Sequence, residues 1–135
     1  MLLHQLPTLY ETQIIKRPSL TIKTPYIADI TNPDDPKTTQ LAHSPSLGCC
    51  GLADKDATVF VSKNENTKAK SAYVIYLSIY SDPYHPGKKE IVGIHPKMSE
   101  LLVENALKAN VLRKLPNIRS YRRETMVHVP DLIHS

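Results

Sequence analysis

The chain has 135 residues, of which 41% are hydrophobic, and this is typical of one folded domain rather than of a disordered chain. The sequence has no apolar run of about 18 residues and no basic N-terminal region, so we expect neither a membrane span nor a signal peptide. Its 17 basic and 13 acidic residues give a net charge of +4, which suits a polyanionic partner without requiring one. We therefore expect an intracellular, cytoplasmic protein that is neither secreted nor membrane-bound.

Short extended segments separated by turn residues fill the first two thirds of the chain. Strands are predicted at 9–16, 26–30, 38–43, 57–62, 71–80 and 90–94. Segment 71–80 is apolar on both faces, which indicates a central strand, and it is expected to form an antiparallel hairpin with 90–94. Such spacing is typical of a small β-barrel or sandwich.

One helix is predicted to begin at Pro96 and to end near Asn110. Proline is favoured in the first turn of a helix, and apolar residues from Met98 to Leu107 recur at helical spacing. A further strand with a basic first half is predicted at 118–129.

Three basic groups could neutralise phosphates: one ends the first predicted strand, one lies in the loop after 57–62, and one lies near the end of the chain. Asn side chains between the lysines could donate hydrogen bonds to phosphate oxygens. For each group alone, a solvated loop or strand edge is an open alternative. The candidate nucleic-acid-binding residues are Lys16, Arg17, Lys63, Asn64, Asn66, Lys68, Lys70, Arg122 and Arg123.

The sequence contains no recognisable catalytic or metal-binding pattern. The six histidines lack metal-ligand spacing, and neither a Gly-x-Ser-x-Gly elbow nor a Gly-rich phosphate loop occurs. The adjacent Cys49 and Cys50 are expected to be small, partly buried side chains rather than a disulfide. Asp54 is interpreted as part of a solvated turn.

Six segments, in order, resemble motifs of the sugar fermentation stimulation protein family. Two departures concern loops: the family's Asn-Thr-Gly is Ser46-Leu47-Gly48 here, and its Lys-Arg-Lys is Lys68-Ala69-Lys70, with one charge fewer. The six segments are 16–30 (KRPS…YIADI), 43–52 (HSPSLGCCGL), 62–70 (SKNENTKAK), 92–95 (VGIH), 102–107 (LVENAL) and 121–124 (YRRE).

The resemblance implies an OB-type barrel that binds DNA, followed by a restriction-endonuclease-like domain. That domain's metal-binding core uses an Asp near a Ser-Arg-x-Asp-Phe motif and a later Glu-x-Lys. The present sequence stops about where the first motif begins, and it has no Glu-x-Lys. Because such a nuclease needs two or more acidic metal ligands, we expect no catalytic residue, metal or cofactor in this chain.

The expected fold is all-β or α+β: a five-stranded OB-like barrel, one helix and a short C-terminal strand. The expected domains are the barrel (1–95), a helical segment (96–117) and a stub of the missing nuclease-like domain (118–135), which is expected to be frayed or to pair with another copy.

Three functions follow from the resemblance. The first is sequence-nonspecific binding of duplex or single-stranded DNA, with Tyr26, Tyr73 or Tyr76 stacking on bases. The second is an interaction half of a split or truncated enzyme, completed by another chain that supplies the nuclease-like domain. The third is an inert gene remnant.

Overall fold

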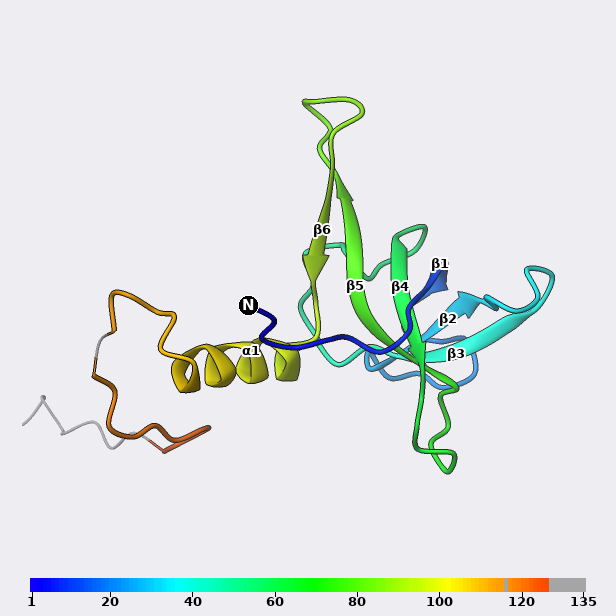
Figure 1. Cartoon of the computed structure of the whole chain (residues 1–135). Coiled ribbons are helices and arrows are strands. Elements are labelled where there is room, and N and C mark those ends of the chain that lie inside the picture. The colour runs from blue at the N-terminus through cyan, green and yellow to red at the C-terminus, as the bar shows by residue number, and fades with distance from the viewer. Residues whose placement is uncertain (116, 127–135) are drawn as a thin grey trace, which may run out of the picture.

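The computed structural model describes residues 1–115 and 117–126, which form six strands and one helix (Figure 1). In this part of the chain, no helix has the length and apolar character that a membrane span requires. The elements are β1 (Tyr10–Lys16), β2 (Ile27–Thr31), β3 (Thr39–His43), β4 (Thr58–Lys63), β5 (Tyr73–Ser81), β6 (Lys89–Gly93) and α1 (Pro96–Lys108).

Five of the strands close into a barrel. The sheet order is β3-β2-β1-β4-β5-β6, and β3 also pairs with β5 in parallel, with His43 opposite Val74. This last pairing joins the ends of the row β3-β2-β1-β4-β5 into a ring, as in a five-stranded OB-type barrel. The prediction of an OB-like barrel is therefore confirmed.

Strand β6 lies outside the ring and extends the C-terminal half of β5. It pairs antiparallel with β5 from Leu77 opposite Gly93 to Ser81 opposite Lys89. The predicted hairpin is thus correct, and its far end projects beyond the barrel (Figure 1). The long β5 therefore belongs to the barrel at one end and to this hairpin at the other.

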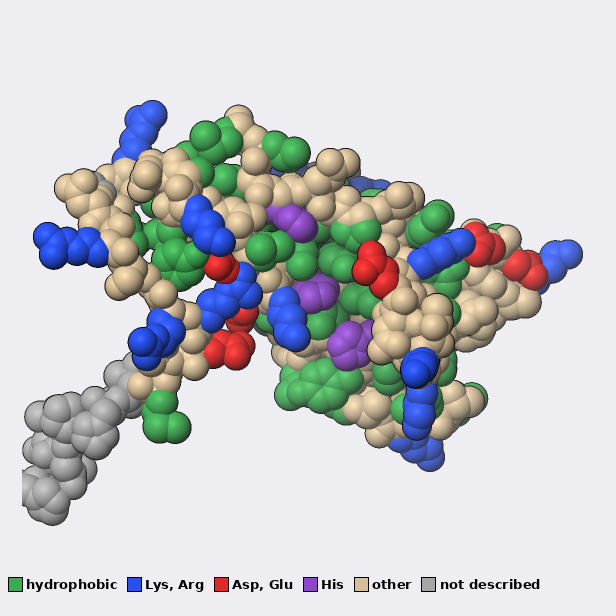
Figure 2. Space-filling view, turned by 60° about the horizontal axis from the view of Figure 1, so that its bottom comes forward, with side chains coloured by type: hydrophobic (Ala, Val, Ile, Leu, Met, Phe, Trp, Pro, Cys, Tyr) green, Lys and Arg blue, Asp and Glu red, His purple; other side chains and the backbone are tan. Residues whose placement is uncertain are grey.

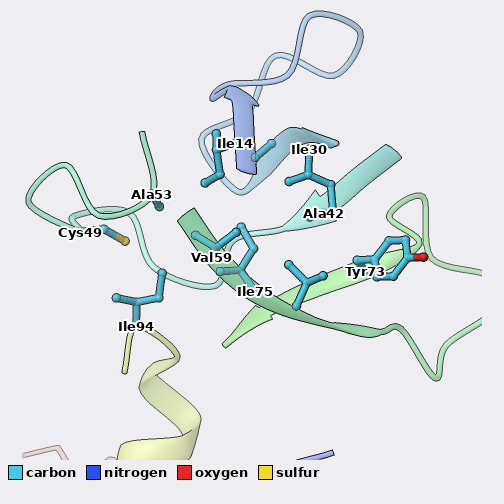
Figure 3. Packing of buried hydrophobic residues seen from close by; sticks show 11 residues of the cluster. Ile14, Ile30, Ala42, Cys49, Ala53, Val59, Tyr73, Ile75 and Ile94 are labelled. Atoms are coloured by element: carbon cyan, nitrogen blue, oxygen red, sulfur yellow. The ribbon is translucent and has the colours of Figure 1, made fainter. Parts of the chain in front are cut away.

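The barrel interior is filled by aliphatic side chains that alternate along the strands. Ile14, Ile30, Val59, Val61 and Ile75 are each at most 1% exposed (Figure 3). Alternate residues of a strand point to the same face, so these β-branched side chains meet inside the ring. Burying each of them stabilises the fold by about 1.5–3 kcal/mol relative to leaving it exposed.

Helix α1 begins with Pro96 at its first position, as predicted, and ends two residues earlier than Asn110. Asn110 adopts a left-handed backbone conformation with φ of 53°, which ends the helix. The predicted apolar face is only partly covered, because Leu102 is 42% exposed. The N-terminal segment lies beside α1, where Asn105 Nδ2 donates a hydrogen bond of 2.7 Å to the Leu3 carbonyl.

The predicted strand at 118–129 is wrong for the residues that the structure describes, 118–126, which form no strand. Instead, side chains attach this segment to α1: the Tyr121 hydroxyl donates to Glu104 at 2.9 Å, and Arg123 pairs with Glu100 and Glu104. A strand needs backbone partners, and here the contacts are made by polar side chains. Residues 127–129 lie outside the described part, and the proposed domain limits stay a prediction.

Candidate nucleic-acid interface

The loop between β4 and β5, residues 64–72, is held in shape by its own asparagines. Asn64 Nδ2 donates to the Ser71 carbonyl at 3.1 Å, and its Oδ1 accepts from the Asn66 amide at 3.1 Å. Asn66 Oδ1 in turn accepts from the Lys68 amide at 3.1 Å. The two asparagines predicted to contact phosphate therefore shape the loop backbone that carries the lysines.

Three lysines lie on or beside this loop, and they differ in their surroundings. Lys63 Nζ is 3.7 Å from Asp34 Oδ2 and 5.7 Å from the centre of the Tyr10 ring, and its side chain is 61% exposed. Lys68 and Lys70 are exposed, and no carboxylate among the described residues lies within ion-pair distance of either. Two of the three ammonium groups are therefore open to a polyanion.

A hollow of about 440 Å³ lies between this loop and the β2–β3 loop. Lys63 and Lys70 line it on one side, and Asn32 and Asp34 line it on the other. The hollow thus combines two cations with one carboxylate, and Asp34 offsets part of the charge of Lys63.

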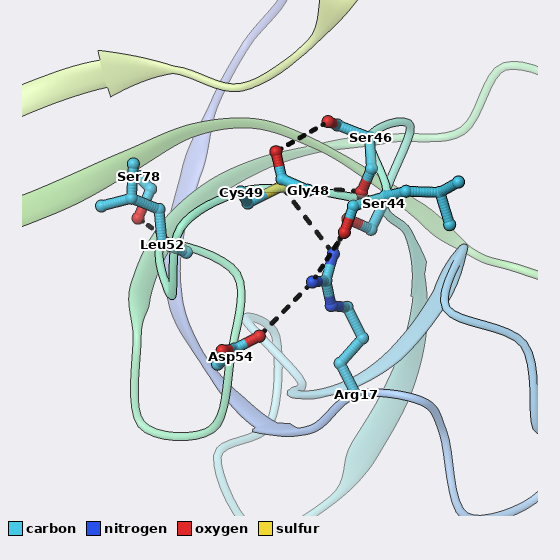
Figure 4. A network of polar contacts seen from close by, with 9 residues as sticks. Arg17, Ser44, Ser46, Gly48, Cys49, Leu52, Asp54 and Ser78 are labelled. Atoms are coloured by element: carbon cyan, nitrogen blue, oxygen red, sulfur yellow. Dashed lines mark hydrogen bonds and ion pairs between the residues drawn. The ribbon is translucent and has the colours of Figure 1, made fainter.

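Arg17 has a different environment from these lysines (Figure 4). Its side chain is only 9% exposed and points into the loop that follows β3. Nη1 donates to Ser44 Oγ at 3.2 Å and to the Ser46 carbonyl at 3.1 Å. Nη2 donates to the Leu47 carbonyl and to Asp54 Oδ1, both at 3.3 Å. Arg17 therefore fastens this loop. Asp54 is 61% exposed, as expected for a solvated turn, and is also the ion-pair partner of Arg17.

The remaining predicted candidates are not gathered with the β4–β5 loop. Lys16 is exposed at the end of β1, and Arg122 is exposed in the segment after α1. Arg123 of that same segment is bound to two carboxylates of α1. Figure 2 shows Lys and Arg side chains spread over one face, with Asp and Glu side chains close to several of them. The structure brings together only Lys63, Asn64, Asn66, Lys68 and Lys70.

From the hollow beside this loop, a groove runs along the outer face of β5, and we call it the β5 groove. Its first part, of about 580 Å³, contains Lys63 and Asn64, and its second part, of about 240 Å³, contains His95. Both parts share Tyr76 as a wall. One edge is formed by the N-terminal segment at His4–Pro7, which crosses in front of β5 and β4 in Figure 1.

Tyr76 and His95 form a stacked pair in the β5 groove, with ring centroids 4.9 Å apart and planes at 25°. Burial lowers the pKa of His95 below its ordinary value, and the nearby His43 and Lys97 lower it further. The ring is therefore neutral at neutral pH. Its Nδ1 is buried without a hydrogen-bond partner. Sequence reasoning had considered the histidines only as metal ligands and missed this pair.

Tyr73, predicted as a possible stacking residue, belongs to the core. It is 4% exposed, and its hydroxyl donates to Asp34 Oδ2 at 3.3 Å. Burial, followed by the Asp34 carboxylate, raises the pKa of Tyr73. Of the three tyrosines singled out from the sequence, only Tyr26 and Tyr76 have rings on the outer surface.

The described residues contain no group of three or more His, Cys, Asp or Glu side chains that could hold a metal ion. Cys49 is buried and Cys50 is exposed, and both are free thiols. The groups gathered here are thus ammonium ions and aromatic rings, which bind phosphates and planar bases.

Comparison with known proteins identifies the family. No family model matches the chain. Over 99 residues it is 34% identical to a sugar fermentation stimulation protein homolog of Alkalilimnicola ehrlichii. The chain belongs to the sugar fermentation stimulation protein family. The matched stretch is 73% of this chain but only 37% of that relative.

The fold is also similar to the solved structure of Pyrococcus furiosus SfsA in complex with Ca²⁺. The TM-score is 0.66 at 16% sequence identity, over 95% of this chain and 48% of SfsA. The matched stretches thus cover less than half of either relative, and the chain matches the N-terminal region of the family. The resemblance stated from the sequence motifs is confirmed.

Proposed function

We propose that this chain binds nucleic acid without sequence preference and that the β4–β5 loop is its main phosphate-contacting element. The observation that carries the proposal is the pair of exposed ammonium groups on Lys68 and Lys70, on a backbone fixed by Asn64 and Asn66. A loop fixed in this way loses little conformational freedom when a ligand binds. Family membership and the OB-type barrel support the same function, because this barrel commonly binds oligonucleotides with the loop between its last two strands.

The strength of binding should depend on salt. Each phosphate contact makes the logarithm of affinity fall by about 0.9 per tenfold rise in salt on duplex DNA and by about 0.7 on single strands. Three lysine contacts therefore give a slope of roughly 2 to 3. Catalysis is not part of the proposal, since the chain matches only the N-terminal region of its relatives.

A second candidate function is contact with a nuclease-like domain of the family. It is favoured by the exposed apolar side chains of Leu102, Val103 and Leu115, in and after α1, which are 42%, 54% and 54% exposed. Exposed apolar side chains are typical of protein–protein contact sites. None of the three belongs to the β4–β5 loop, so changes to the loop leave such a contact intact.

The test is a charge reversal, with Lys63, Lys68 and Lys70 all changed to Glu. Loss of three phosphate contacts should weaken binding to a DNA oligonucleotide, measured by fluorescence anisotropy, on the order of 100-fold. The melting temperature should stay near that of the wild type, because the three side chains are exposed.

The matched control changes Lys55, Lys88 and Lys89 to Glu. These lysines are also exposed and lie away from the β4–β5 loop, and the change in net charge is identical. The control should bind within a few-fold of the wild type. Equal losses in the two triple variants would show that only net charge matters, and an unchanged affinity in the first would reject the loop as the contact element.

A further inference from the structure

Two stacked ring pairs lie on the same outer face of the barrel, where β3 meets β5. His43 is paired directly with Val74 across the parallel strands, so their side chains share a face. Tyr76 follows two residues after Val74 and returns to that face. Because the His95 ring stacks on the Tyr76 ring, it lies at that face too.

The second pair is formed by Tyr26, which directly precedes β2, and His43 at the end of β3. Their ring centroids are 6.4 Å apart with planes at 21°, against 4.9 Å and 25° for Tyr76 and His95. Both pairs thus have nearly parallel rings. Figure 2 shows histidine side chains among hydrophobic ones near the middle of one face, with Lys and Arg side chains around them.

These rings are not core residues, as comparison with Tyr73 shows. Tyr73 is 4% exposed and its hydroxyl is hydrogen-bonded, whereas Tyr26 is 40% exposed and Tyr76 lines the β5 groove. Within residues 1–115 and 117–126, His95 Nδ1 is buried beside the groove without a hydrogen-bond partner. A ligand in the groove can supply that partner.

The charges along the β5 groove suit a polyanion. Lys63 lines its first part, and the exposed Lys97 follows His95 by two residues at the start of α1. Glu65 is the carboxylate that lines the first part. The rings between the two lysines offer neutral planar surfaces, on which bases stack regardless of sequence.

We infer that the preferred ligand is single-stranded nucleic acid, with bases stacked on Tyr76–His95 and Tyr26–His43 and phosphates at the lysines of the β4–β5 loop. This inference rests on the proposed function and deepens it. Bases in a duplex are already stacked and paired, so only a single strand presents base faces to these rings. The lysines supply binding to any nucleic acid, and the rings supply the preference for single strands.

The test compares Tyr76→Leu with Tyr76→Phe, which keeps the ring, on an oligothymidylate and on a blunt duplex of equal length. Loss of one stacked base should weaken single-strand binding roughly 5- to 150-fold in Tyr76→Leu and leave duplex binding unchanged. Tyr76→Phe should bind the single strand within a few-fold of the wild type. If Tyr76→Leu does not fold, Tyr26→Leu, with its 40% exposed ring, takes its place with Tyr26→Phe as its control.

The outcomes separate the two proposals. A wild type that binds neither probe rejects the proposed function itself. A wild type that binds both, with ring variants that match it on the single strand, leaves the function intact and overturns the stacking inference. Equal losses of single-strand and duplex binding in a folded leucine variant would also overturn it, because the ring would then not distinguish the two ligands.

Discussion

Arg17 and the lysines of the β4–β5 loop are basic residues that follow a barrel strand: Arg17 follows β1, and Lys68 and Lys70 follow β4. Their surroundings in the folded chain differ. Arg17 is 9% exposed and gives its guanidinium to the loop after β3, whereas Lys68 and Lys70 are exposed and touch no carboxylate in the part of the chain that the structure describes. A basic residue can therefore serve the fold or a ligand, and its contacts decide which.

The difference follows from side-chain chemistry. A planar guanidinium has five N–H donors in a fixed fork, so one Arg17 can satisfy two carbonyls, a hydroxyl and the Asp54 carboxylate at once. A lysine ammonium is a strongly hydrated point charge on a flexible stem, which favours exposure to water. Under the proposed function, phosphates are contacted by the lysines, which have no structural task of this kind.

The largest expected effect is that of Arg17→Ala on stability. The change leaves the Ser46 and Leu47 carbonyls without their donor, so the free energy of unfolding should fall by about 2 kcal/mol or more. Denaturant unfolding measures it, with the exposed neighbour Lys16→Ala as a control that should stay within about 0.5 kcal/mol. If Arg17→Ala kept wild-type stability but lost DNA binding, Arg17 would contact the ligand, and the distinction between a structural Arg17 and ligand-binding lysines would be wrong.

A smaller effect is expected from Asp34→Asn, which should strengthen binding to DNA rather than weaken it. This change removes the carboxylate 3.7 Å from Lys63 Nζ, and an exposed ion pair contributes up to about 1 kcal/mol. Binding to DNA should therefore become up to about five-fold tighter at low salt. Asp35→Asn is the control: it removes the same charge from the neighbouring residue, which is not paired with Lys63, and should change DNA binding less. Weaker binding in Asp34→Asn would show that the carboxylate helps to position Lys63 for the ligand.

The sequence predicted the barrel well, because strand signals are local. Alternating apolar residues such as Val59 and Val61, or Tyr73 and Ile75, mark the buried face, and prolines and turn residues mark the ends. The predicted strand at 118–129 failed over its described residues, 118–126, for a physical reason. The residues there satisfy their polar groups through side chains, with Tyr121 and Arg123 bound to Glu104, and a strand needs a neighbouring backbone.

The candidate site could be predicted only in part. The lysines around Asn64 and Asn66 are adjacent in sequence, so their grouping on one loop was visible without a structure. The separation of Arg17 from them was not, because it depends on Ser44, Ser46 and Asp54 folding around one side chain. Such contacts between distant segments leave no local pattern.

Tyr26 and Tyr76 were singled out from the sequence, but their pairing with His43 and His95 was missed for a related reason. Tyr26, His43, Tyr76 and His95 come from four separate segments, and only the parallel pairing of β3 with β5 brings them to one face. Parallel pairing has a long connection, so short-range patterns do not reveal its register. The outward positions of His43 and Tyr76 on alternating strands were the available signal.

The most direct measurement is an NMR titration of the ¹⁵N-labelled chain with an oligothymidylate, which reports the shift of each backbone amide. We expect shifts to concentrate in loop 64–72, along β5 around Tyr76, and at Tyr26 and His43, while residues 46–54 around Arg17 stay unchanged. Shifts concentrated at 46–54, with loop 64–72 unaffected, would contradict the proposed function.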